Sequence, residues 1–207
     1  MILRLVKAAL AVTFIATAFG TAQAAKKEGD WYRDPTTGAL VQHKVTRRSG
    51  YASNVSPIRK RQVRFDGKYA PGTIVIDTSE RRLYYVLRRG KAMKYGIGVG
   101  RAGFQWSGTH RVTRKAKWPG WTPPKRMIAR VKRETGKTLK GFYPGGPTNP
   151  LGARAMYIGS TIYRIHGTNQ PWTIGQAMSS GCIRLANNDV EDLYSRVRIG
   201  SKVVVRR

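Results

Sequence analysis

Two short motifs, separated by a turn-rich span, constrain the fold of this 207-residue chain more than any other feature. The first motif, His-Gly-Thr, begins at His166, and the second, Ser-Ser-Gly-Cys, ends at Cys182, which is the only cysteine in the sequence. The span between them contains Pro171 and Gly175, residues that favour turns, so the chain can fold back there. We therefore expect a fold that brings the side chains of His166 and Cys182 together.

A thiol beside an imidazole is a chemically useful pair. Only a few per cent of an ordinary cysteine is thiolate at neutral pH, and histidine is the usual base that activates it. Gly181 lets the backbone approach a substrate closely, and the amides around Gly181 and Cys182 could point at a developing oxyanion. The alternative is structural, because a lone cysteine is often a small buried apolar group. The pattern therefore indicates Cys182 as a candidate nucleophile and His166 as its candidate base.

The residues around both motifs resemble the L,D-transpeptidase catalytic domain, also called the YkuD domain. That family has a His-Gly-Thr-type element followed by Ser/Thr-x-Gly-Cys, an apolar residue and Arg or Asn, which here read as residues 166–168 and 179–184. The likeness covers about residues 70–207 and includes the loop sequence Asn-Pro-Leu-Gly at 149–152. One position departs from the commonest form, because many members have His where this chain has Ser180.

The resemblance implies a mainly β, β-sandwich-like domain with one packed helix after the cysteine. It also implies that Cys182 attacks the carbonyl of the third residue, meso-diaminopimelate, of a peptidoglycan tetrapeptide stem, while His166 acts as general base and D-alanine leaves. An amine of another stem would then give a 3→3 cross-link, and an amine of an envelope protein would anchor that protein to the wall. Water would instead make the enzyme a carboxypeptidase. Carbapenem β-lactams are expected to acylate the same thiol.

Four further residues are candidates for binding the oxyanion or the substrate. They are Gly181, Gly167, Ser179 and Arg184. Ser179 is expected to orient the site through hydrogen bonds rather than to react, because a thiol is the better nucleophile. Arg184 either pairs with a substrate carboxylate or forms a structural ion pair that supports the cysteine loop. No sequence motif suggests a metal site, and we expect no cofactor.

The first 24 residues have the pattern of a secretory signal peptide. Arg4 and Lys7 precede a short apolar run over 8–19, and Ala22-Gln23-Ala24 is a small-x-small cleavage site. The alternative is a short N-terminal membrane anchor. Cleavage at this site predicts an exported protein of the periplasm or cell envelope.

The chain is strongly basic, with 39 Lys and Arg against 10 Asp and Glu, a formal net charge of +29. Such a surplus indicates an anionic partner or surface. Nucleic acid is not expected, because the chain has an export signal and no nucleic-acid motif. Acidic stem peptides and peripheral contact with anionic membrane fit better. The rival function is a non-catalytic basic protein that binds anionic cell-wall polymer.

The chain divides into three parts on this reading. After the signal peptide, residues 25–69 form a basic extension or linker, because no period of 2 or 3.6 persists there. Residues 70–207 form the catalytic domain, which begins with β-branched runs typical of strands. Residues 125–140 are basic and predict a short helix or lid. The single clear helix follows Cys182, with a cap at Asn187 or Asn188. Its apolar face contains Val190, Leu193, Tyr194 and Val197.

Overall fold

The computed structural model describes residues 31–33, 40–42 and 54–207. The predicted signal peptide lies outside the described residues. The described elements, in chain order, are β1 (Trp31–Arg33), β2 (Leu40–Gln42), β3 (Arg61–Arg64), β4 (Ile74–Asp77), β5 (Arg82–Val86), β6 (Lys91–Gly96), β7 (Val99–Gly100), β8 (Gly108–Lys117), α1 (Lys125–Thr135), β9 (Arg154–Ile158), β10 (Arg164–His166), the 3-10 helix η1 (Pro171–Thr173), β11 (Ala177–Ser179), β12 (Ile183–Arg184), α2 (Asn187–Arg196) and β13 (Lys202–Arg206).

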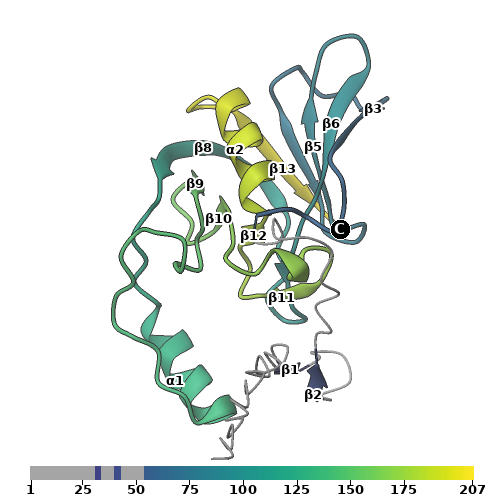
Figure 1. The fold of residues 1–207 in the computed structure, drawn as a ribbon. Helices are drawn as coiled ribbons and strands as arrows, with labels where there is room; N and C mark the ends of the chain where they lie inside the picture. Colours follow the sequence, from purple (N-terminus) through teal and green to yellow (C-terminus); the bar gives the residue numbers. More distant parts are fainter. Residues whose placement is uncertain (1–30, 34–39, 43–53) are drawn as a thin grey trace, which may run out of the picture.

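Nine of the strands within the described ranges form one mixed sheet, in the order β12-β10-β9-β8-β13-β4-β5-β6-β3. The last strand, β13, lies in the middle of this sheet, parallel to β4 and antiparallel to β8. β8 joins the two halves, because its first residues pair with β13 and its later ones with β9. A register irregularity between Val112 and Arg114 accompanies this change of partner, and β8 curves there (Figure 1). The sheet is thereby folded around its core.

The core is formed by apolar side chains that alternate along the strands and by one face of α2. Ile74 and Ile165 are wholly buried in one cluster with Val190 and Leu193 of α2. Tyr194 packs against the same cluster. This confirms the predicted mainly β, sandwich-like fold with one packed helix after the cysteine. Burial at about 25 cal/mol per Å² of apolar surface is the main force that holds α2 to the sheet.

The second helix in the described part of the chain, α1, is of a different kind. None of its residues is buried, although its sequence is amphipathic. It ends at Gly136, whose φ of 70° is the left-handed conformation that glycine adopts at low cost. Figure 1 shows α1 away from the sheet, on the long connection between β8 and β9. The prediction of a short helix over part of 125–140 therefore agrees with the structure.

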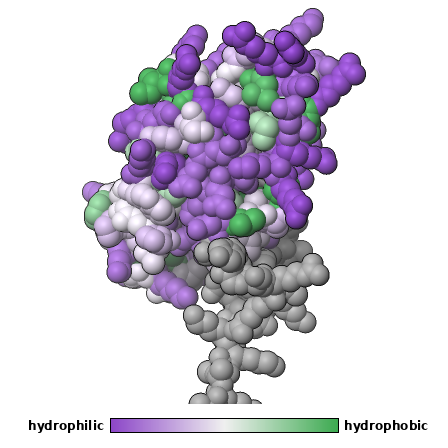
Figure 2. All heavy atoms as spheres, turned by 45° about the horizontal axis from the view of Figure 1, so that its top comes forward, coloured by the Kyte–Doolittle hydropathy of each residue, from purple (hydrophilic) through white to green (hydrophobic). Residues whose placement is uncertain are grey.

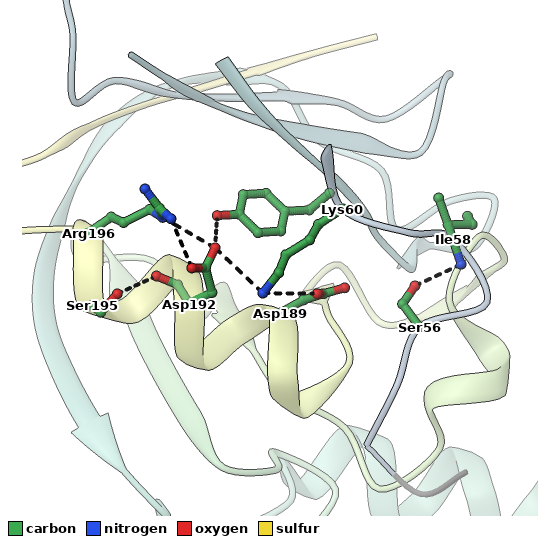
Figure 3. Close-up of polar contacts among 8 residues, drawn as sticks. Ser56, Ile58, Lys60, Asp189, Asp192, Ser195 and Arg196 are labelled. Carbon is green, nitrogen blue, oxygen red and sulfur yellow. Dashed lines mark hydrogen bonds and ion pairs between the residues drawn. The ribbon is translucent and has the colours of Figure 1, made fainter. Parts of the chain in front are cut away.

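Part of the predicted extension packs on the domain. β3 pairs antiparallel with β6 and forms one edge of the large sheet. Lys60, just before β3, reaches α2, where its Nζ lies 3.8 Å from carboxylate oxygens of Asp189 and Asp192 (Figure 3). The assignment of residues 25–69 to an extension did not anticipate this strand. The reason is that Val63 is the only apolar residue within it, so the sequence carries no strand period.

The surface is polar over most of the face shown in Figure 2, where apolar side chains gather only in small separate patches. Among the residues that the structure describes, no helix is both long and apolar enough to cross a membrane. Within the same ranges, no group of three or more His, Cys, Asp or Glu side chains could hold a metal ion.

Candidate active site

β10 and β12 bring the two sequence motifs side by side. They pair in parallel, with Ile165 opposite Ile183 and His166 opposite Arg184. Ile165 and Ile183 are buried in the core. Because side chains alternate between the two faces of a strand, His166 and Arg184 point away from that core. Cys182 immediately precedes β12 and therefore lies next to the strand that carries His166.

The imidazole of His166 is held in one tautomer. Its Nδ1 lies 2.6 Å from the carbonyl oxygen of Gly167, and a carbonyl can only accept, so Nδ1 carries the hydrogen. Nε2 is then the unprotonated nitrogen, the one able to take a proton. Burial lowers the pKa of His166 to about 3, although the hydrogen bond to Gly167 acts in the opposite direction. The imidazole is therefore neutral at pH 7, which is the form a general base needs.

The thiol of Cys182 is also held in its neutral form. Burial raises its pKa, and this effect is opposed by hydrogen bonds with the backbone and side chain of Arg164 and by the charges of Arg164 and Arg184. A neutral thiol beside a neutral imidazole differs from a preformed thiolate–imidazolium pair.

The loop that carries Cys182 is fixed largely by its own backbone and by Ser179. The hydroxyl of Ser179 donates to the carbonyl of Cys182 at 2.6 Å and accepts from the N–H of Gly181 at 3.2 Å. Arg101 N–H donates to the carbonyl of Ser179 at 3.0 Å. Ser179 thus orients the loop. The N–H of Gly181 is engaged by the hydroxyl of Ser179.

Gly181 can be only glycine here. Its φ is +104°, and a Cβ at this position would lie 2.4 Å from the ring of Tyr163 and 3.2 Å from the carbonyl oxygen of Phe104. Trp106 donates its indole N–H to the carbonyl of Gly181 at 2.8 Å and stacks on Tyr163 with 4.5 Å between ring centroids. Neither Trp106 nor Tyr163 belongs to a sequence motif, and Trp106 is distant from Gly181 along the chain, so the sequence carries no signal for this contact.

The guanidinium of Arg184 is buried against Gly98. A Cβ on Gly98 would lie 3.1 Å from its Nε and Nη2. Both nitrogens are inaccessible and have no hydrogen-bond partner among the described residues, and no described carboxylate forms an ion pair with Arg184. Burial lowers its pKa to about 10, so it is still charged at neutral pH. The structural ion pair that the sequence left open is therefore not present in the described part of the chain.

Asn187 connects the His166 side of the site to α2. Its Oδ1 accepts from the N–H groups of Ala153 and Thr168, at 3.0 and 3.3 Å, and its Nδ2 donates to Oδ1 of Asn54. The predicted cap of α2 is wrong in this respect: the N-cap residue is Ala186, and no side chain caps the helix. The amide of Asn187 is instead used to hold the loop after His166, which the local sequence pattern could not distinguish from a cap.

The fold and the adjacent motifs define a β domain with a cysteine and a histidine on neighbouring strands. A family model described as the L,D-transpeptidase catalytic domain matches residues 71–205. The chain belongs to this family, which confirms the resemblance found in the sequence.

Individual relatives carry the same family name. The chain is 41% identical over 135 residues to a probable L,D-transpeptidase YbiS of Escherichia coli K12, covering 63% of this chain and 43% of that protein. The chain therefore spans less than half the length of that curated relative. A catalytic domain from the Enterococcus faecium L,D-transpeptidase, solved as its ertapenem acyl form, is 20% identical and has a TM-score of 0.50 over 68% of this chain and all of that one. It shares the fold.

A third protein has a different name. A structure from Brucella melitensis, solved as a probable carnitine operon oxidoreductase, is 47% identical, covers 73% of this chain and 96% of its own, and has a TM-score of 0.48. Its name describes another activity. The family assignment rests on the match to the family model and not on that name.

Proposed function

We propose that this protein is a peptidoglycan L,D-transpeptidase in which Cys182 is the nucleophile and His166 the general base. The observation that carries the proposal is the neutral, buried imidazole whose Nδ1 is fixed by the Gly167 carbonyl, on the strand next to Cys182. Nε2 is then the nitrogen that takes the thiol proton. The substrate class comes from the family to which the chain belongs.

The first half-reaction transfers an acyl group to the enzyme. The sulfur of Cys182 forms a bond to the carbonyl carbon of the third residue of a tetrapeptide stem, and Nε2 of His166 takes the thiol proton. The bond from that carbon to the nitrogen of the terminal D-alanine breaks, and the imidazolium returns the proton to the leaving amine. The products are a thioester on Cys182 and free D-alanine.

The second half-reaction releases the thiol. An acceptor amine attacks the thioester carbon and loses a proton to Nε2 of His166. The C–S bond breaks, and the imidazolium gives that proton to the sulfur, which restores the Cys182 thiol and the neutral imidazole. An amine from a second stem gives a 3→3 cross-link, and an amine from an envelope protein gives an anchored protein. Water in place of the amine gives hydrolysis.

Residues around the thiol supply electrostatic support. We assign the oxyanion to the amides near Gly181 and Cys182, so the Gly181 N–H must leave the Ser179 hydroxyl as the oxyanion forms. The charged guanidinium of Arg184 has Nε and Nη2 enclosed, so we assign it an electrostatic effect on Cys182 in place of a direct bond to a substrate carboxylate. Gly167 contributes the carbonyl that sets the tautomer of His166.

The proposal extends to location and inhibitors. Residues 1–24 are assigned as a signal peptide, which places the domain in the periplasm or cell envelope. The net charge of +29 suits contact with acidic stems and with anionic membrane. Acylation of the Enterococcus faecium relative by ertapenem supports the expectation that a carbapenem acylates Cys182 here.

One incubation tests the function. Purified protein is mixed with muropeptide tetramers, and the products are analysed by mass spectrometry, with Cys182→Ala as the control. Release of D-alanine with a cross-linked or hydrolysed product, absent from the control, is the expected result. A parent protein that gives neither product, yet sediments with sacculi, would support the non-catalytic binding function. Intact-mass analysis after exposure to ertapenem should show one adduct that Cys182→Ala lacks.

A further inference from the structure

α1 lies apart from the sheet and buries none of its residues. Its half-buried residues are Met127, Ile128, Arg130 and Val131. An isolated helix shorter than about 12–15 residues is marginal in water, and most helices in proteins are held by a buried apolar face. α1 has 11 residues and no such buried face. Its position must therefore depend on contacts with neighbouring segments.

Those contacts lead to the catalytic loop. Arg130 Nη2 donates to the hydroxyl of Ser180 at 2.8 Å, and its guanidinium lies 5.0 Å from the ring centroid of Phe104. Glu134 Oε1 accepts from Arg101 at 3.3 Å, and the guanidinium of Arg101 lies 5.1 Å from the same ring. The polar side of α1 is thus tied to Ser180, two positions before Cys182, and to Arg101 and Phe104.

Ser180 contributes differently from its neighbours. The carbonyls of Ser179, Gly181 and Cys182 accept from Arg101 N–H, Trp106 and Ser179, respectively. These bonds fix the backbone of the loop without the Ser180 side chain. The Ser180 hydroxyl instead accepts from α1. Removal of this hydroxyl should therefore loosen α1, which keeps its contacts with Arg101 and Phe104, while the loop that holds the thiol keeps its conformation.

We propose that the hydrogen bond from Arg130 to Ser180 latches α1 to the cysteine loop, and that Arg130 is thereby a positioning residue for substrate binding. α1, which is latched to the cysteine loop, carries five basic residues and one acidic residue, Glu134. That charge suits an acidic peptide donor. The inference rests on the proposed transpeptidase function for its substrate, but the latch itself does not.

Hydrogen–deuterium exchange tests the latch directly. Ser180→Ala leaves the sequence of α1 unchanged, so faster exchange of its amides reports a lost contact rather than a lower helix propensity. We expect exchange over 125–135 to rise about tenfold or more, since a hydrogen bond from a charged group is involved. Arg126→Gln is the matched control: it removes a charge from an exposed position of the same helix and should leave exchange near the parent rate. Unchanged exchange in Ser180→Ala would overturn the proposal.

Steady-state kinetics with a soluble tetrapeptide donor test whether the latch on α1 affects substrate binding. Ser180→Ala and Arg130→Gln should each raise KM about tenfold and leave kcat within about threefold. Each variant loses the charged hydrogen bond that holds α1, whereas the loop that carries the thiol keeps its conformation. The double variant should show the same KM as either single variant. Ser180→Thr keeps the hydroxyl and should retain the parent KM.

The outcomes separate this inference from the proposed function. A fall in kcat with unchanged KM would mean that Ser180 acts on Cys182, and the positioning role of Arg130 would be overturned. A parent protein without turnover would refute the proposed function. The exchange measurement would still decide whether Arg130 and Ser180 form a latch.

Discussion

Trp106 donates its indole N–H to the carbonyl oxygen of Gly181, the residue immediately before the candidate nucleophile, at 2.8 Å. The same indole is stacked on Tyr163, with planes within 4° of parallel. The aromatic pair therefore fixes both the position and the orientation of the backbone next to Cys182. This contact gives the first prediction.

Trp106→Phe should lower kcat/KM for a tetrapeptide donor by about two- to tenfold, because it removes one hydrogen bond while a ring still stacks on Tyr163. The thermal midpoint should change little. Trp118→Phe, at an exposed position, is the control and should leave kcat/KM unchanged. Equal activity of the two variants would show that the indole N–H does not position the loop.

Gly181→Ala should strongly lower turnover, whereas Gly90→Ala should not. Both glycines have positive φ, of 104° and 62°, so both variants should lose roughly 1–3 kcal/mol of stability from backbone strain. Only at Gly181 would the added Cβ collide with the Tyr163 ring, whereas Gly90 has nothing within 4 Å. Displacement of the thiol should cost about 10²-fold in kcat/KM. Donor turnover and thermal melts of both variants check this, and comparable activities would contradict it.

Alkylation of Cys182 by iodoacetamide should accelerate steadily with pH. Burial raises the pKa of this thiol, and His166, with its pKa lowered to about 3, is neutral above pH 5 and cannot pair with a thiolate. The rate should rise about tenfold per pH unit from pH 6 to 8, because only the thiolate reacts. A plateau over that range would instead indicate a preformed ion pair.

The variant His166→Asn separates the role of the imidazole from the ionisation of the thiol. It should leave the pH profile of Cys182 alkylation nearly unchanged, because the neutral imidazole does not set the thiolate fraction. Turnover of the donor should fall at least about 10²-fold, the usual loss when a general base is removed. Turnover close to that of the parent would exclude His166 as the base.

Asp189 should make the protein less stable as the pH rises. Burial raises its pKa to about 6, against the opposing charge of Lys60, while Asp192 adds to the rise. A carboxyl with a raised pKa holds its proton more tightly in the folded state. The free energy of unfolding therefore falls as the pH increases from about 4 through about 6, by roughly 1–3 kcal/mol.

Denaturant unfolding of the parent and of Asp189→Asn at several pH values measures this effect. Between pH 4 and pH 7, the free energy of unfolding of Asp189→Asn should increase relative to that of the parent. Asp66→Asn, which changes an exposed carboxyl, is the control, and its free energy of unfolding should vary with pH as that of the parent does. A parent that gains stability relative to Asp189→Asn over this interval would show that the ion pair with Lys60 outweighs burial (Figure 3).

Two shortened proteins should behave differently. Removal of residues 25–53 should leave turnover of soluble stem peptides unchanged, because the described packing contacts on the domain begin at Asn54. Removal of residues 25–69 also deletes β3, the pairing partner of β6, and Lys60. It should lower the thermal midpoint by several degrees. Equal midpoints would show that β3 is dispensable.

Binding to sacculi should weaken in both shortened proteins, because residues 25–53 carry part of the positive charge. Added salt should have the same effect, since the Debye length falls from about 10 Å at 0.1 M to about 3 Å at 1 M. Co-sedimentation across a salt series measures this. Equal binding of the full and shortened proteins at low salt would mean that the segment is only a linker.

The sequence by itself determined the features that depend on neighbouring residues along the chain. The His-Gly-Thr and Ser-Ser-Gly-Cys motifs marked His166 and Cys182, and the apolar period after Cys182 predicted the packed face of α2. The β-branched runs predicted β4 and β5. Each of these signals is local, because the spacing of apolar residues within a segment indicates whether that segment is a strand or a helix.

Only the tertiary structure decided which distant segments meet. The central place of β13, the contact of Trp106 with Gly181, and the bond from Arg130 to Ser180 all join residues far apart in the chain, and no period records such contacts. β3 is an edge strand with little apolar content, so backbone pairing with β6, rather than sequence pattern, fixes it. The protonation of His166 and Cys182 likewise follows from burial, which depends on how the whole chain packs.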